Sequence, residues 1–279
     1  MIEVGKWQTL RMLRSKEFGI YLGEAGKEEE SVLLPKKQVP KDLRIGDEIN
    51  VFIYRDSQDR KIATVNRPKL TVGEIGKLKV VSVSSIGAFM DCGLERDILL
   101  PFKEQTTKVA VGREYLVYMY LDKSERLCVT MRLYSHLNHQ PPYEKNDFFK
   151  GTVYEWKDHM GAFVAVDDRY SGLIPKSEIY HPIHVGDVVE GRILNVREDG
   201  KMDLSIRRPA YLQMDVDSDV ILKRLEACNG TLPFTDKASP ELIKQEFGMS
   251  KNEFKRAVGR LLKEGKIEIT AETIQKKEG

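Results

Sequence analysis

The sequence predicts a mainly β protein with a C-terminal α+β domain, and two observations carry that prediction. One pattern, in which apolar and polar residues alternate as they do along β-strands, occurs three times between residues 1 and 209. Beyond residue 209 the apolar residues recur instead with the helical period of about 3.6 residues. We therefore expect three small β-domains in tandem, followed by one domain built mainly on helices.

The three copies align on residues at which the backbone turns. Each copy has a glycine, a proline 14 to 16 residues later, and a second glycine 11 residues after that proline. The first glycines are Gly19, Gly87 and Gly161, the prolines are Pro35, Pro101 and Pro175, and the second glycines are Gly46, Gly112 and Gly186. An interval of 11 residues that recurs in three places indicates one repeated module.

These copies set the expected domains: barrels at 1–68, 69–134 and 149–209, a linker at 135–148, and a winged-helix domain at 215–279. About five short strands in about 60 residues cannot cover the edges of an open sheet, so each module is expected to close into a barrel. The five-stranded oligonucleotide-binding (OB) barrel fits that size. The Pro141-Pro142 pair predicts a stiff bend in the linker, which would separate the first two barrels from the third barrel and the winged helix.

The C-terminal segment has the signals of a winged helix-turn-helix domain. Asp217 or Ser218 is the expected start of a first helix, and Ser239 with Pro240 begins a second that ends at Gly248. Ser250 begins a third helix, and Glu253 completes its capping box. A strand and a hairpin follow, which is the order of the winged-helix motif.

The third of these helices has an apolar and a basic face. Its apolar stripe is Phe254, Ala257, Val258, Leu261 and Leu262, and its basic face is Lys255, Arg256, Arg260 and Lys263. Between residues 250 and 266 there are six basic and two acidic residues. This face is a candidate for phosphate contacts; the alternatives are a solvated surface and a protein-docking surface.

Composition excludes several classes of protein. No apolar run reaches the roughly 18 residues of a membrane span, and no secretory leader is evident. Three cysteines without CxxC spacing predict reduced thiols in a cytoplasm, and no cofactor or metal site is expected. The net charge is only +2, and the three barrel segments carry +2, +1 and −1. A polyanionic partner must therefore be argued from individual residues.

A glycine stands beside an aromatic or apolar residue in every copy. We interpret it as a β-bulge that resets the strand and places pairs of side chains on the outer face, where nucleic-acid bases stack. The pairs are Phe18/Tyr21, Ile86/Phe89 and Met160/Phe163. The alternative is that the glycine turns a barrel corner and the ring fills the core.

The repeat resembles the RNA-binding repeat of ribosomal protein S-one. In the third copy the resemblance lies in "GTV", "MGAFV", "GLIPKSEI", "VGDVV" and "DLSIR". It implies an OB barrel that binds single-stranded RNA by stacking and polar contacts, through Phe18, Tyr21, Phe89, Phe163, Asp56, Asp122, Arg67, Arg132 and Arg207. The copies depart from the pattern where Ile86 and Met160 replace the first aromatic and Arg197 replaces the acid.

Three such repeats and a winged helix in fewer than 300 residues resemble the conserved virulence factor B family of bacteria. The resemblance implies a non-catalytic, cytoplasmic protein that binds single-stranded RNA and regulates gene expression post-transcriptionally, with the winged helix assisting. An alternative is a DNA-binding regulator or protein-docking adaptor that acts through the winged helix. An enzyme is disfavoured, because no stretch outside the expected domains carries a recognisable catalytic constellation.

Overall fold

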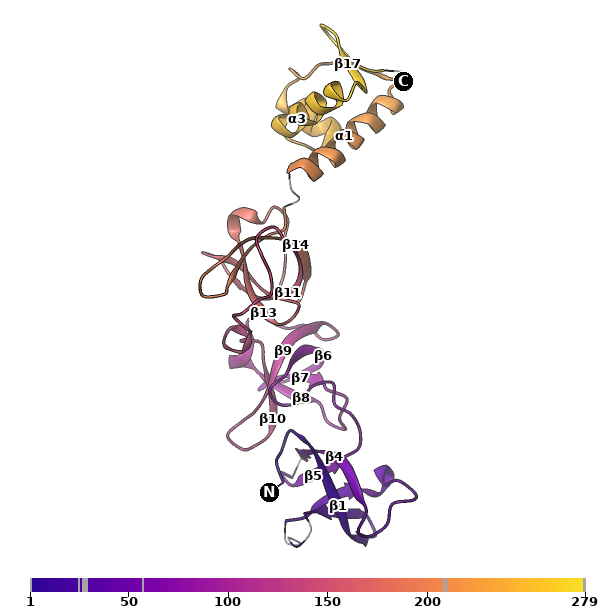
Figure 1. Cartoon of the computed structure of the whole chain (residues 1–279), viewed down its shortest axis with the longest axis vertical. Helices are drawn as coiled ribbons and strands as arrows, with labels where there is room; N and C mark the ends of the chain where they lie inside the picture. Colours follow the sequence, from indigo (N-terminus) through magenta and orange to yellow (C-terminus); the bar gives the residue numbers. More distant parts are fainter. Residues whose placement is uncertain (1, 25, 27–29, 57, 208–209, 278–279) are drawn as a thin grey trace. The chain divides into compact units, whose positions relative to one another are not determined.

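The structure is a computed structural model that describes residues 2–24, 26, 30–56, 58–207 and 210–277, and the side chains of the first helix from 217 onward. It divides into two compact units, Met1–Ile206 and Arg207–Gly279 (Figure 1). The first unit holds three closed five-stranded barrels and the second is a winged-helix domain. Both architectures are as the sequence predicts.

Each barrel uses its strands in the same spatial order. The first comprises β1 (Trp7–Lys16), β2 (Gly19–Gly23), β3 (Val32–Pro35), β4 (Glu48–Arg55) and β5 (Lys61–Thr64). The second comprises β6 (Ile75–Val83), β7 (Gly87–Asp91), β8 (Ile98–Pro101), β9 (Glu114–Leu121) and β10 (Leu127–Thr130). The third comprises β11 (Phe148–Lys157), β12 (Gly161–Val166), β13 (Tyr170–Pro175), β14 (Val188–Val196) and β15 (Met202–Ser205). The first strand pairs with the second and fourth, and the third runs parallel to the fifth, which closes the barrel.

One polar contact recurs in all three barrels. A 3-10 turn follows the third strand at Lys36–Gln38, Phe102–Glu104 and Lys176–Glu178. The last residue of each turn accepts a hydrogen bond from a buried hydroxyl on the fifth strand: Thr64 to Gln38 (2.6 Å), Thr130 to Glu104 (2.8 Å) and Ser205 to Glu178 (2.6 Å). Since a buried hydroxyl without a partner is costly, this bond fixes the turn against the barrel.

The β-bulge predicted at the first glycine of each copy is not found there. The register shifts instead lie in the first strand of each barrel, between Met12 and Arg14, Val80 and Ser82, and Val153 and Glu155. Gly19 has a φ of 156°, and a Cβ there would lie 2.1 Å from the carbonyl oxygen of Leu34. The glycine therefore turns a corner where two backbones approach closely.

The expected separation of the first two barrels from the third is wrong, because all three form one compact unit. Leu133 and Leu137 are buried, and the Asn138 amide donates to the Arg169 carbonyl at 2.9 Å, so this segment packs on the barrels. Burial removes both leucine side chains from water, and the free energy gained holds this segment against the barrels. The division of the chain falls after Ile206 instead.

The second unit contains α1 (Ala210–Ala227), β16 (Thr231–Leu232), α2 (Pro240–Phe247), α3 (Lys251–Lys263), β17 (Ile267–Ile269) and β18 (Ile274–Lys276), with sheet order β16-β18-β17. Its core includes Ile221, Leu225, Ile243, Phe254 and Leu261. The predicted caps are confirmed: Ser239 accepts from Leu242, and Ser250 and Glu253 form a capping box. Across the described residues, no helix has the length and apolar character that a membrane span requires.

Two predictions in this unit are wrong. Helix α1 begins at Ala210, so Asp217 and Ser218 lie inside it, and both are buried. No glycine or proline interrupts residues 210–227, so the helix continues through a local cap signal. Leu262, placed on the apolar stripe of α3, is 46% exposed because it lies at the edge of that stripe.

Candidate nucleic-acid interface

The second aromatic of the repeat points away from the barrel core. In β2, Ile20 and Leu22 face inward, so Tyr21 between them faces outward and is half-buried. Phe89 has the same position between Ala88 and Met90 in β7. The rings therefore lie on the outer face, as the stacking hypothesis requires.

The residues that precede the corner glycines are also exposed. Phe18 is 66% exposed, Ile86 58% and Met160 38%. They flank the turn between the first and second strands, next to the outward-facing ring. In the first barrel this gives two aromatic side chains at one edge.

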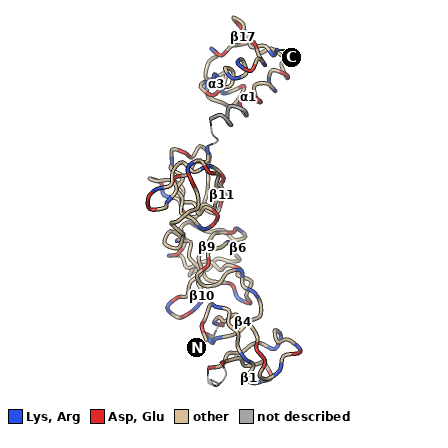
Figure 2. Tube along the Cα trace, in the orientation of Figure 1, with Lys and Arg blue, Asp and Glu red and all other residues tan. Residues whose placement is uncertain are grey.

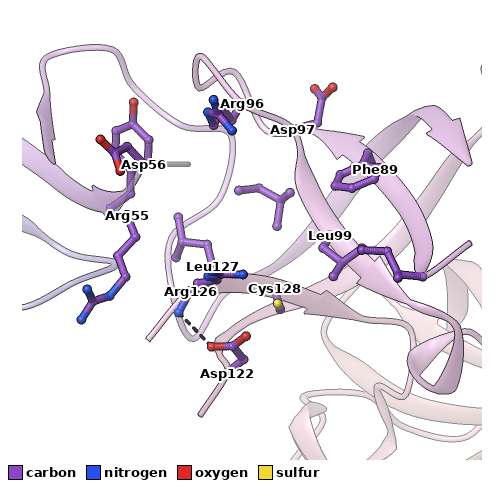
Figure 3. A pocket seen from close by; sticks show the side chains of 13 residues that line it. Arg55, Asp56, Phe89, Arg96, Asp97, Leu99, Asp122, Arg126, Leu127 and Cys128 are labelled. Carbon is purple, nitrogen blue, oxygen red and sulfur yellow. Dashed lines mark hydrogen bonds between the residues drawn. The ribbon is translucent and has the colours of Figure 1, made fainter. Parts of the chain in front are cut away.

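Equivalent pockets lie beside Tyr21 and Phe89. The first, of about 280 Å³, is lined by Tyr21, Ser31, Leu33, Asp56, Arg60, Lys61 and Ile62. The second, of about 310 Å³, includes the matching Phe89, Leu99, Asp122, Arg126, Leu127 and Cys128 (Figure 3). Each pocket thus combines a ring on the second strand, an aliphatic side chain on the third, and an arginine that immediately precedes the fifth.

A cation lies over the ring in the first barrel. The Arg14 guanidinium carbon is 4.5 Å from the centroid of the Tyr21 ring, and Arg14 also donates to the Ser31 hydroxyl at 3.1 Å. An arginine held on an aromatic face presents its remaining N–H groups to a phosphate.

Asp56 and Asp122 order the hairpins beside these pockets. Asp56 accepts hydrogen bonds from the amides of Gln58 (2.8 Å) and Arg60 (3.1 Å). Asp122 accepts equivalent bonds from Ser124 (2.7 Å) and Arg126 (3.0 Å). Burial opposes ionisation of Asp56, but the side chain of Arg60 and the two amides together hold its pKa below the ordinary value. Both carboxylates line the pockets while closing a turn.

In the third barrel the corresponding ring is covered. Phe163 is only 8% exposed, and its ring centroid is 6.2 Å from that of Tyr154. It belongs to one apolar cluster with Leu116 of the second barrel and Leu137 of the linker. The expectation of a solvent-facing ring is therefore wrong for Phe163, because inter-barrel packing covers the face. Lys157 lies over the same ring, with its ammonium 4.8 Å from the centroid.

The closing arginines lie outside the two pockets. Arg67, Arg132 and Arg207 are exposed just after the fifth strands. Arg132 donates from Nε to the Lys103 carbonyl at 2.8 Å. The sequence reasoning missed the pocket arginines Arg60 and Arg126, although each follows its aspartate by four residues in "DSQDR" and "DKSER".

The basic face of α3 is largely solvent-exposed. Lys255, Arg256 and Lys263 are exposed, whereas Arg260 is half-buried and its Nε is 2.7 Å from the Glu264 carboxylate. Along the barrels, basic and acidic positions are interspersed (Figure 2). Within the described part of the chain, no three His, Cys, Asp or Glu side chains group as a metal site would require.

Family models match nearly the whole chain. The S1 domain, which is the S-one repeat, matches residues 4–66 and 72–132. The second domain of virulence regulatory factor CvfB matches 135–208, and the CvfB-like winged helix domain matches 219–275. Conserved virulence factor B of Staphylococcus epidermidis (strain ATCC 12228) is 30% identical over 257 residues, 88% of this chain and 85% of the relative. The chain belongs to the conserved virulence factor B family.

Two further proteins resemble this member of the conserved virulence factor B family. The uncharacterized protein YitL of Bacillus subtilis (strain 168) is 32% identical over 275 residues, 94% of this chain and 90% of its own length. A solved multidomain protein with nucleic acid binding domains from Streptococcus pneumoniae TIGR4 is 24% identical, covers 98% of both chains with a TM-score of 0.54, and shares the fold. S1 and winged-helix domains are not enzyme families; they are the domains of a nucleic-acid-binding regulatory protein.

Proposed function

We propose that this chain binds single-stranded RNA through its tandem S1 barrels, with the basic face of α3 assisting. The observation that carries the proposal is the repeated pocket, in which Tyr21 or Phe89 lies beside an arginine on the same face of two barrels. Unpaired bases stack on exposed rings, and arginines bind the phosphates that join them. The role is non-catalytic and cytoplasmic, and it regulates gene expression post-transcriptionally.

The charge distribution predicts how this binding depends on salt. With barrel segments between +2 and −1, few phosphates are neutralised, so affinity falls only shallowly as salt rises. Stacking supplies most of the affinity of each module. Linkage of the modules in one chain raises the effective concentration of each for the same RNA.

A second candidate function is binding of duplex DNA or of a protein through the winged helix. It is favoured by the exposure of Lys255, Arg256 and Lys263 along one face of α3. A recognition helix of a helix-turn-helix domain presents such a face to the major groove.

One titration separates the two functions. Labelled unstructured pyrimidine RNA and a DNA duplex are titrated at two salt concentrations with wild-type protein, Tyr21→Ala/Phe89→Ala, and Arg256→Ala/Arg260→Ala. Loss of two stacking rings, at about 1–3 kcal/mol each, should weaken RNA binding at least about tenfold. Phe148→Ala is the matched control, because that ring is 69% exposed and lines neither pocket.

Two results would count against RNA binding by stacking. One is an RNA affinity that the double aromatic variant leaves unchanged. The other is strong duplex binding that disappears only in the arginine variant, which would make the winged helix the main site.

A further inference from the structure

The pocket beside Phe89 is built by two barrels. Tyr54, Arg55 and Asp56 of the first barrel line it together with strands and loops of the second. Figure 3 shows Arg55 and Asp56 on one side, with Phe89 and Leu99 on the other. Its volume of about 310 Å³ lies at the lower end of the range for ligand pockets, which suits one nucleotide unit.

Two reciprocal ion pairs join the barrels at this pocket. The Arg126 guanidinium of the second barrel donates to both carboxylate oxygens of Asp59 in the first. In the opposite sense, Arg55 of the first barrel pairs with Glu125 of the second. Both carboxylates belong to hairpin turns, where Asp59 and Glu125 have φ values of 61° and 56°.

Arg126 and its counterpart in the first barrel, Arg60, form ion pairs with different carboxylates. Arg60 pairs with Asp56 four residues earlier, at 2.7 Å. Arg126 takes only a backbone bond to the equivalent Asp122, and its guanidinium turns to the neighbouring barrel. The pocket arginine of the second barrel is thus neutralised by a carboxylate from outside that barrel.

Other arginines of the pocket keep unused donors. No hydrogen bond or ion pair joins the exposed Arg96 to any other residue that the structure describes. The Nε of Arg55 is buried without an acceptor among those residues. A phosphate that enters the pocket would therefore meet the exposed Arg96 guanidinium, which no described side chain saturates.

Exchange of Asp59 for a phosphate costs little. The side chains of Asp59 and Arg126 are 50% and 54% exposed, and ion pairs this exposed to solvent contribute little to stability. A phosphate can likewise accept two parallel hydrogen bonds from a guanidinium through two of its oxygens. The carboxylate thus occupies the position that a phosphate bound to Arg126 would take.

We propose that the junction between the first two barrels binds one nucleotide unit of single-stranded RNA. Its base stacks on Phe89, and its phosphate binds Arg96 and Arg126 in exchange for Asp59. This inference rests on the proposed function and adds that the first barrel completes the site of the second. The Asp59 carboxylate is then a competitor of RNA, not a ligand for it.

The test uses the full chain and a short pyrimidine RNA. Asp59→Asn should raise RNA affinity about two- to fivefold, because it removes the competing charge; asparagine, like aspartate, tolerates the positive φ. Arg96→Ala and Arg126→Ala should lower affinity at least about threefold and reduce the salt slope by about 0.7 each. Lys108→Ala is the matched control, since this exposed lysine of the second barrel lines neither pocket.

Either of two results would overturn the inference. One is an Asp59→Asn variant that is fully folded under the titration conditions but binds RNA no more tightly than wild type. The other is a pair of arginine variants with the affinity and salt slope of Lys108→Ala. If wild-type protein still binds RNA in those cases, the proposed function stands and only the junction site fails. Binding of free pyrimidine nucleotide as tight as that of RNA would show a small-molecule site instead.

Discussion

Each barrel has a glycine at the corner between its first and second strands, namely Gly19, Gly87 and Gly161. The sequence predicts that each glycine is structurally special, and the structure agrees, but the cause differs from the expected bulge. A Cβ at Gly87 would lie 2.3 Å from the carbonyl oxygen of Leu100. Such an approach between two strands depends on the closed barrel, so no local pattern could distinguish it from a bulge.

Gly87→Ala is predicted to destabilise the first unit by at least about 1–3 kcal/mol, through backbone strain and the contact with Leu100. Gly112→Ala is the control, because Gly112 also has a positive φ, 85°, but open space around its Cβ position. Both tryptophans, Trp7 and Trp156, lie in the first unit, so denaturant unfolding followed by their fluorescence reports its stability. An equal or smaller loss in Gly87→Ala would contradict the close-approach explanation.

The aromatic residues mark a second limit of prediction from sequence. The pattern of a glycine beside an aromatic residue predicts that Tyr21 and Phe89 lie on the outer face, and both rings do. It places Phe163 there too, but that face packs against the second barrel and the linker. Local periodicity specifies which face a side chain occupies; it does not specify what covers that face.

Helix boundaries illustrate the same limit at the level of elements. The caps of α2 and α3 were predictable because Ser239, Ser250 and Glu253 satisfy backbone groups within their own turns. The start of α1 was not predictable, because the helix begins at Ala210 and continues through the cap signal at Asp217.

The paired hairpins between the first two barrels make a prediction about pH. The side-chain hydrogen bond from Arg126 lowers the pKa of Asp59 below its ordinary value, and the one from Arg55 does the same for the pKa of Glu125. A carboxyl whose folded pKa is depressed stabilises the native state above its unfolded pKa and loses that contribution as pH falls through the folded pKa.

We therefore predict a pH-dependent difference between wild-type protein and Asp59→Asn/Glu125→Gln. Wild type should be the more stable by an amount that is constant near neutral pH and shrinks below about pH 4. Denaturant unfolding across this range measures the difference. A difference that is the same at about pH 3 and pH 7 would show that these ion pairs add nothing to the junction.

At the level of the whole molecule, two features of the sequence were sufficient to predict three barrels and a winged helix. They are the threefold repeat and the change from strand to helical periodicity. Contacts between modules were not predictable, because they join side chains such as Arg126 and Asp59, which lie far apart in the sequence and belong to different barrels. Such contacts between modules form the pocket that the first two barrels share, and they cover the face of the third barrel on which Phe163 lies.

Photocrosslinking locates the bases of a bound RNA on the surface of the protein. Full-length protein is irradiated with a short RNA that carries 4-thiouridine, and the crosslinked peptides are identified by mass spectrometry. If bases stack on the barrels, crosslinks form in β2 and β7, at Tyr21 and Phe89, and unlabelled RNA competes them away. Crosslinks confined to segments outside the two pockets would contradict base stacking on the barrels.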